Sequence, residues 1–387
     1  MGIVSAIGLT VEENLASLLA GTSGIGHCGT LEGYEGYLVG EVKQSNEALT
    51  AHLAQSTRIL SRTSLLGIAA AKQAWGNSPA SKELRTGLIS ATSVGGMDLT
   101  EKFYKSYLKG QSPDFSILSR HDSGNTTEEI AKEIGINGYV NTLSTACSSG
   151  ANAIMLGARL IEQGKLDRVL VGGSDPLTSF TINGFKSLMI YDEQWCRPFD
   201  ESRAGLNLGE GAAFLLLESE KSRQVSGNTA LCQLKGWANA ADAYHQTASS
   251  PDGKGATMAI QNALKKSGLN KNQIAYINAH GTGTKNNDLS ESTALTNIFG
   301  TEVPPFSSTK SFTGHTLAAA GAIEAVYAVL AIQHGLLFPN LNFQNTIAET
   351  SLIPILKLTS NHRIGAVLSN SFGFGGNNST LVFSEND

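Results

Sequence analysis

The sequence predicts an α/β fold in which helices cover buried β-sheets. Short apolar runs alternate along the chain with segments whose apolar residues recur at helical spacing, and several of the runs end in glycine. Such runs are typical of strands buried on both faces, and their alternation with helices favours sheets sandwiched between helical layers. The chain has 387 residues, 41% of them hydrophobic and 42 of them glycine. This length fits two or three domains, or one large fold made of two similar halves.

The first half contains helical and strand patterns in turn. An apolar run at residues 139–143 is followed by a sharp polar turn and an Ala-rich segment, an order that predicts strand, turn and helix. The predicted helices are residues 57–75, 126–134 and 151–161, and the predicted strands are residues 86–91, 139–143, 167–173 and 214–217.

A polar stretch at residues 218–228 is the best candidate boundary between two halves, which we place at 1–222 and 223–387. The second half repeats the alternation of helical and strand patterns seen in the first. Its predicted helices are residues 256–267, 289–299 and 316–334, and its predicted strands are residues 274–279, 365–369 and 379–383.

Charge and cysteine content narrow the class of protein. A net charge of −5 argues against general affinity for nucleic acid. The four cysteines show neither a disulfide framework nor a metal-binding CxxC pair, which favours a reducing cytoplasm and no metal site. We find no apolar run of the roughly 18 residues that span a bilayer, and no basic-then-apolar leader, so we expect no membrane segment.

Cys147 is the candidate nucleophile. It lies in the turn between the predicted strand 139–143 and the predicted helix 151–161. A thiol at a helix N-terminus meets unsatisfied backbone N–H groups and the positive end of the helix dipole, which we expect to favour the reactive thiolate. By itself this position is equally that of a small buried cysteine, the fate we assign to Cys28, Cys196 and Cys232.

Two histidines and a glycine-rich loop could complete a site around this thiol. His280 and His315 stand in glycine-containing loops, where backbone and ligand can approach closely. Residues 369–377 (SNSFGFGGN) follow a predicted strand and offer exposed backbone N–H groups, the material of an oxyanion hole. Each feature alone has a structural explanation, a loop histidine or a turn between strands, but their joint occurrence is specific.

These motifs, in this order, resemble those of the elongating β-ketoacyl-acyl carrier protein synthases of the thiolase-like superfamily. The resemblance runs nearly from end to end. It rests on residues 144–150 (STACSSG), 197–200 (RPFD), 209–212 (GEGA), 280–284 (HGTGT), 308–311 (SSTK), 313–315 (TGH), 319–322 (AAGA) with Glu324, and 370–376 (NSFGFGG). It implies a thiolase-like fold of two similar halves in five layers, α-β-α-β-α.

The resemblance also implies a reaction and a role for each matching residue. The enzyme would perform a decarboxylative Claisen condensation of acyl-Cys147 with malonyl carrier protein, in fatty acid elongation. It would bind no cofactor of its own, since its substrates travel on the phosphopantetheine of acyl carrier protein. The implied residues are Cys147 as nucleophile, His280 and His315 facing the malonyl thioester, Lys310 and Glu324 orienting them, Cys147 and Phe374 as oxyanion hole, Phe374 as gate, and Thr282 and Thr284 as pantetheine contacts.

Partners and alternatives follow from the same resemblance. Acidic carrier protein needs basic docking points, for which the candidates are Arg58, Arg62, Lys72 and Arg197. A homodimer is implied. Residues 121–125 and Lys285, which replaces a usual proline, depart from the common pattern. Residues 121–125, together with residues 180–185 and 205–209, are similar to ketosynthases of aryl polyene pathways. Those enzymes pair with a chain-length factor, so a polyene or other type II polyketide ketosynthase is one alternative. A non-catalytic chain-length factor is another, and the presence of Cys147 argues against it.

Overall fold

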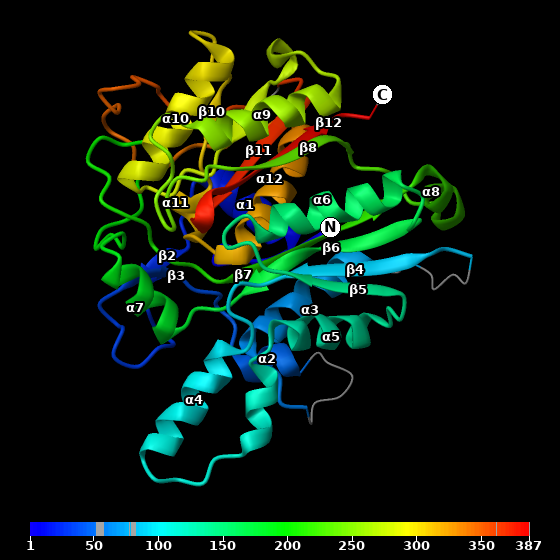
Figure 1. The fold of residues 1–387 in the computed structure, drawn as a ribbon, viewed down its shortest axis with the longest axis vertical. Helices are drawn as coiled ribbons and strands as arrows, with labels where there is room; N and C mark the ends of the chain where they lie inside the picture. Colours follow the sequence, from blue (N-terminus) through cyan, green and yellow to red (C-terminus); the bar gives the residue numbers. More distant parts are fainter. Residues whose placement is uncertain (52–57, 77, 79–82, 361, 387) are drawn as a thin grey trace.

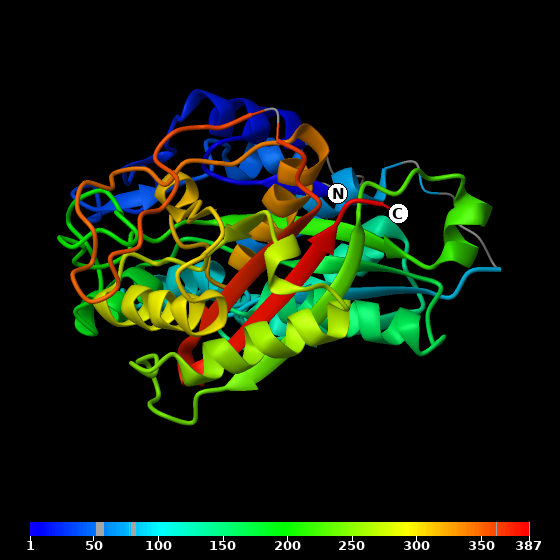
Figure 2. The same cartoon turned by 90° about the horizontal axis from the view of Figure 1, so that it is seen from above.

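The computed structural model describes residues 1–51, 58–76, 78, 83–360 and 362–386, and it contains two five-stranded sheets stacked between helices (Figures 1 and 2). The first sheet has the order β1-β7-β6-β4-β5. Its strands are β1 (Gly2–Val4), β4 (Thr86–Ala91), β5 (Tyr139–Leu143), β6 (Arg168–Asp175) and β7 (Gly211–Glu218). Strands β5, β4 and β6 are parallel, while β7 runs antiparallel to β6 and β1 antiparallel to β7.

The second sheet repeats this design with residues of the second half. Its order is β10-β9-β11-β12-β8, and it is built from β8 (Gln233–Ala241), β9 (Tyr276–Asn278), β10 (Phe306–Ser307), β11 (Ala366–Gly373) and β12 (Asn377–Ser384). Again three neighbouring strands, β10, β9 and β11, are parallel, and β12 and β8 follow antiparallel. The chain is therefore made of two similar halves, as the sequence predicts.

Helices form the other three layers. Helices α3 (Arg62–Trp75) and α5 (Ser123–Ile134) cover the outer face of the first sheet. Helices α6 (Ser149–Glu162) and α12 (Ala320–His334) lie between the sheets and contact both. Helix α9 (Lys254–Ser267) covers the outer face of the second sheet, with α10 (Lys285–Phe299) beside it. The predicted five-layer α-β-α-β-α arrangement is confirmed.

Several elements were not predicted. They are the strands β1, β8 and β10, α1 (Val11–Ala20), the hairpin of β2 (Ile25–His27) and β3 (Leu38–Gly40), α2 (Asn46–Thr50), α4 (Met97–Leu108), α7 (Ser179–Ser187), α8 (Glu220–Ser226) and α11 (Lys310–Thr313). Helix α8 falls within the polar stretch that we expected to be a plain boundary, and the Ser219 hydroxyl caps it by accepting from the Ser222 N–H. The start of the predicted helix 57–75 lies outside the described residues.

The sequence analysis found no apolar segment long enough to span a bilayer, and this finding is wrong for one segment. Residues Leu317–His334, which include α12, form a window of 18 residues with mean hydropathy 1.4, long and apolar enough to cross a bilayer. In the structure 83% of this window is buried inside the protein. Because α12 is surrounded by two sheets and a second helix, it is apolar on all sides for the reason that any central core helix is.

The two central helices touch at their N-terminal ends, and glycine permits the contact. A Cβ at Gly150 of α6 would lie 2.7 Å from the Ala318 carbonyl oxygen, and one at Gly321 of α12 would lie 2.8 Å from the Ala151 nitrogen. No side chain fits in either gap. The start of α6, which carries Cys147, is thus held against the segment that follows His315.

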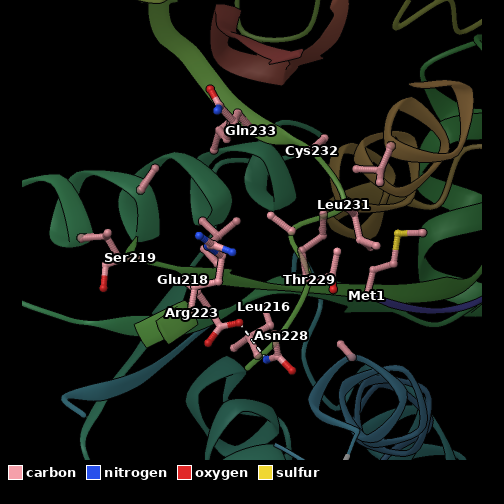
Figure 3. A pocket seen from close by; sticks show the side chains of 18 of the residues that line it. Met1, Leu216, Glu218, Ser219, Arg223, Asn228, Thr229, Leu231, Cys232 and Gln233 are labelled. Atoms are coloured by element: carbon pink, nitrogen blue, oxygen red, sulfur yellow. Dashed lines mark hydrogen bonds between the residues drawn. The ribbon is translucent and has the colours of Figure 1, made fainter. Parts of the chain in front are cut away.

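Part of strand β7 in the first sheet has an unpaired edge, whereas its counterpart β12 in the second sheet is paired along its whole length. Strand β8 pairs with the whole of β12, whereas the short β1 pairs only with Ala212, Ala213 and Phe214 of β7. Along residues 215–218 of β7, no described strand takes the place that β8 takes in the other half. A groove of about 1000 Å³ lies there instead (Figure 3), lined by residues that include Met1, Trp75, Leu216, Leu231 and Cys232.

Candidate active site

Cys147 lies in a tight turn between β5 and α6, as the sequence predicts. The residue before it, Ala146, has a positive φ of 53°, a conformation that non-glycine residues rarely adopt and that marks a sharp turn. The Thr145 N–H donates to the Ser149 hydroxyl at 2.7 Å, which closes the turn. The thiol is buried at the N-terminal end of α6.

The predicted thiolate is contradicted by this burial. Desolvation raises the pKa of the Cys147 thiol to about 11, although the Lys310 charge and the backbone N–H groups of Phe374 and Cys147 act in the opposite direction. Burial therefore favours the neutral thiol of Cys147 over the thiolate in the free protein.

His280 stands directly beyond the end of β9, and two buried carboxylates of α10 hold its loop. Glu291 accepts from the His280 and Gly281 N–H groups at 2.9 and 2.8 Å. Asp288 accepts from the N–H groups of Thr282 and Gly283 at 3.0 to 3.2 Å. The backbone of residues 280–283 is therefore fixed by four charge-assisted hydrogen-bond donors.

Both histidines are held in the same neutral tautomer. Nδ1 of His280 lies 3.1 Å from Nζ of Lys310, which can only donate, and Nδ1 of His315 accepts from the Leu317 N–H at 3.2 Å. With Nδ1 an acceptor, the ring proton of each lies on Nε2. Burial and the Lys310 charge lower the pKa of both rings well below the ordinary value, so neither is protonated at pH 7. The rings lie 5.4 Å apart at 85°.

Lys310 and Glu324 form a buried ion pair behind these rings. Lys310 Nζ contacts the Glu324 carboxylate, the His280 Nδ1 and the His280 carbonyl oxygen, so its three N–H bonds each have an acceptor. Burial raises the pKa of Glu324 to about 7, against the effect of the lysine charge. The sequence-predicted orienting pair is thus brought into direct contact with His280, and no direct contact with His315 is seen.

The glycine-rich loop lies against the Cys147 turn. Strand β11 ends at Gly373, where a Cβ would come within 3.0 Å of the Thr145 carbonyl oxygen and 3.2 Å of the Cys147 nitrogen. Phe374 follows, and its N–H is among the groups that favour the thiolate of Cys147. Its ring stacks on Phe185 of α7 at 5.5 Å. Two backbone amides, those of Cys147 and Phe374, therefore point at one place beside the sulfur.

A cavity of about 330 Å³ brings most of the predicted residues together. Its wall includes Cys147, His280, His315, Thr282, Thr284 and Phe374. The hydroxyls of Thr282 and Thr284 lie 2.9 Å apart. Lys285 lines the same cavity at the first residue of α10. Thiol, two neutral imidazoles and two amides on one small cavity can stabilise negative charge developing on a thioester oxygen.

The candidate docking cations do not share one surface. Arg62 is buried, and its guanidinium forms two hydrogen bonds with Glu210 at 2.6 and 2.7 Å, so its predicted role at the surface is wrong. Arg58 pairs with Glu129 and Glu133, and Lys72 pairs with Glu133, on the α3 side of the first sheet. Arg197 pairs with Asp192, and its backbone lies against Gly283 of the site loop.

Three functional carboxylates escaped the sequence analysis. Asp288 and Glu291 hold the His280 loop, and Asp175, at the end of β6, accepts from the N–H groups of Ser93 and Ala318 at 3.0 and 2.8 Å. Burial raises the pKa of Asp175 to about 6. The signal that could have revealed the first two is their spacing of three residues in the helix directly after the loop, since such residues share a helix face.

Comparison with known proteins agrees with this geometry. The model of the β-ketoacyl synthase N-terminal domain matches residues 1–223, and that of the β-ketoacyl synthase C-terminal domain matches residues 231–344. The 3-oxoacyl-[acyl-carrier-protein] synthase 2 of Staphylococcus aureus is 33% identical over 402 residues, covering 99% of each chain. Nodulation protein E of Rhizobium meliloti is 33% identical over 92% of this chain and 90% of its own.

Solved structures show the same relationship. The ishigamide ketosynthase/chain length factor superposes with a TM-score of 0.92 at 30% identity, covering all of this chain and 98% of its own. The ketosynthase ApeO, solved with its chain length factor ApeC from Xenorhabdus doucetiae, gives 0.85 at 33% identity, with coverages of 100% and 96%. Fold and site together define a thiolase-like acyltransferase. The chain belongs to the β-ketoacyl synthase family.

Proposed function

We propose that the protein is a β-ketoacyl-acyl carrier protein synthase that extends an acyl chain by decarboxylative condensation with malonyl carrier protein, in fatty acid elongation. One observation carries the proposal: a thiol at the start of α6 shares a cavity with two histidines whose ring protons lie on Nε2. Its substrates would arrive on phosphopantetheine, with Thr282 and Thr284 of the cavity wall as contacts.

The first step transfers the acyl group to Cys147. The sulfur attacks the thioester carbonyl, and the resulting oxyanion is met by the N–H groups of Cys147 and Phe374. When the tetrahedral intermediate collapses, the bond to the pantetheine sulfur breaks, and the proton lost by Cys147 ends on that sulfur. Because burial favours the neutral thiol in the free protein, the Cys147 proton leaves as the sulfur attacks the thioester.

The second step removes CO2 from the malonyl thioester. The carbon–carbon bond to the carboxylate breaks, and its electron pair becomes an enolate whose oxygen carries the negative charge. Nε2–H groups of His280 and His315 donate to that oxygen, and each such donor is worth about 3 kcal/mol. Both rings can donate in their neutral form, because Nδ1 of each is an acceptor and the ring proton lies on Nε2.

The third step forms the new carbon–carbon bond. The enolate carbon attacks the carbonyl of acyl-Cys147, the two amides again hold the oxyanion, and the Cys147 sulfur leaves. A β-ketoacyl thioester remains on the carrier protein, and the released Cys147 thiolate takes up a proton from solvent, since its first proton left on the pantetheine sulfur. Lys310 and Glu324 support this chemistry by fixing the ring of His280, without touching substrate.

A second candidate function is supported by the structural relatives. Two of the similar structures, at 30% and 33% identity, are a ketosynthase/chain length factor and a ketosynthase bound to its chain length factor. The chain could therefore be the ketosynthase subunit of an aryl polyene or other type II polyketide pathway. A non-catalytic partner subunit is disfavoured, because Cys147 and both histidines lie in one cavity.

The proposed partners are acyl carrier protein and a second subunit, within the cytoplasm. Strand β5 is the outer strand of the first sheet and pairs only with β4 among the described strands. Its first residues, Tyr139 and Val140, are 38% and 36% exposed. An exposed apolar edge strand favours pairing with another chain. All four cysteines are free thiols, which suits a reducing compartment.

The test uses purified protein, malonyl carrier protein and a panel of acyl carriers, with products identified by mass spectrometry. Elongation of saturated acyl chains supports fatty acid synthesis, and elongation only of unsaturated aryl primers, or only with an added partner, supports the polyene pathway. Cys147→Ala should abolish condensation because no nucleophile remains. Near-normal product from Cys147→Ala would contradict the proposal.

A further inference from the structure

Three asparagines from separate elements meet beside the Cys147 turn. Asn152 lies in the first turn of α6, Asn239 lies on β8, and Asn377 is the first residue of β12. The side-chain oxygen of Asn377 accepts from the Asn152 and Asn239 amides at 3.0 and 2.6 Å. Asn152 and Asn239 lie outside the family motifs, Asn377 is the last residue of the glycine-rich loop 369–377, and none of the three takes part in the proposed chemistry.

This cluster continues into the turn that carries the nucleophile. The hydroxyl of Ser148, the residue directly after Cys147, lies 2.7 Å from the same oxygen of Asn377. The Asn152 amide also donates to the Thr145 hydroxyl at 2.9 Å. Asn377 therefore accepts from both the Cys147 turn and the helix behind it.

Asn377 is also connected to the second segment of the site, the loop that carries Phe374. It follows Phe374 by three residues, at the end of the short turn of residues 374–376. The Cys147 turn and the Phe374 loop come from different halves of the chain. In this region they touch through backbone at Gly373 and through side chains at Asn377. The relative position of the Cys147 and Phe374 amides depends on these contacts.

We propose that Asn377, with Asn152 and Asn239, is a positioning cluster that sets the spacing of the Cys147 and Phe374 amides and so the geometry of the oxyanion hole. This inference rests on the proposed function, because it assigns those amides to the tetrahedral oxyanion. Donors aimed at a developing charge lose effect when they shift by a fraction of an ångström. Hydrogen bonds that fix both the Cys147 turn and the Phe374 loop therefore affect the rate of the steps that form the oxyanion.

The histidine step offers an internal reference. Malonyl decarboxylation depends on His280 and His315, whose positions are fixed by Lys310 and the Leu317 N–H and not by the asparagine cluster. Alkylation of Cys147 by iodoacetamide forms no oxyanion, although the Phe374 N–H favours the thiolate that reacts. A variant that disturbs only the oxyanion hole should therefore slow acyl transfer and condensation, leave decarboxylation unchanged and change alkylation only slightly.

The experiment compares the purified full chain with Asn377→Leu, Asn377→Asp and the control Asn386→Leu, an exposed asparagine after β12. For Asn377→Leu we expect kcat for acyl transfer to fall about 30-fold, somewhat less than loss of a whole oxyanion donor costs. KM for the acyl carrier, malonyl decarboxylation and alkylation of Cys147 should stay within about threefold. Asn377→Asp keeps the acceptor oxygen and should restore most of the rate, and Asn386→Leu should resemble the parent chain.

The outcomes separate the two proposals. If the parent chain transfers no acyl group, the proposed function fails and this inference fails with it. If the parent condenses but Asn377→Leu keeps its rate, only the positioning role is overturned. Equal losses in acyl transfer, decarboxylation and alkylation, or no rescue by Asn377→Asp, would also overturn it, since they indicate a general structural defect.

Discussion

Burial shifts the pKa values of Cys147, His280 and His315 more than the neighbouring charges do. Cys147 and the two histidines are all held in their neutral forms, because the cavity removes the water that would stabilise their ions. Neutral imidazoles suit the donation of Nε2–H bonds to an enolate. A neutral thiol protects the free protein from side reactions until substrate arrives.

The raised pKa of Cys147 leads to a simple prediction about its reactivity. With a folded-state pKa of about 11, the thiolate fraction increases about tenfold for each pH unit between pH 7 and 9. The rate of Cys147 alkylation by iodoacetamide, followed by mass spectrometry, should increase in the same proportion with no plateau. Cys147→Ser reports the background from the other thiols. A plateau below pH 8 would show that the thiolate is preformed.

The Lys310–Glu324 pair predicts separable effects on catalysis and stability. Lys310→Met removes the partner of His280 Nδ1 and leaves Glu324 buried without its counter-charge. We expect malonyl decarboxylation to fall about 100-fold and unfolding free energy, from urea titration, to fall by about 3–5 kcal/mol.

A double variant distinguishes the two effects. In Lys310→Met combined with Glu324→Leu no buried charge remains, so stability should largely return while decarboxylation stays low. Full decarboxylation by the single variant would show that Lys310 has no part in orienting His280.

Helices and strands with a regular apolar pattern could be predicted from the sequence. Features that depend on contacts with residues far away in the sequence could not. The strands at 86–91 and 139–143 and the helix behind Cys147 are found as expected, because their own residues decide burial and periodicity. The roles of Asp288 and Glu291 depend on backbone N–H groups of a loop that only the fold brings near. The state of the thiol was mispredicted for the same reason, since burial is a property of the assembled halves.

The free edge of β7 predicts that an added strand stabilises the protein. Three extended apolar residues fused before Met1 would continue β1, pair with Leu216, Leu217 and Glu218, and occupy part of the groove of Figure 3. Each kcal/mol gained raises Tm by about 2–4 °C in proteins of moderate size, so we expect a rise of that order by calorimetry. An extension containing proline is the matched control, because it cannot donate to the sheet. Equal Tm values for the two extensions would show that no strand forms.

The whole molecule is predicted to associate through β5. Val140→Glu places a charge on the exposed edge strand and should shift the sedimentation coefficient from that of a dimer to that of a monomer. Val225→Glu, on exposed α8, is the control and should leave it unchanged. A parent chain that sediments as a monomer, or a Val140→Glu variant that remains a dimer, would contradict an interface at this edge.

The close contacts at Gly150 and Gly321, at the start of the two central helices, make catalysis depend on the packing of the two halves. Cys147 is supplied by the first half and both histidines by the second, so neither half alone contains a site. The two halves share one apolar core, which contains Ile154 of the first half and Val326 and Val367 of the second. The thiol meets the imidazoles only in a chain whose halves are packed together, so a chain in which only one half is folded has no enzymatic activity.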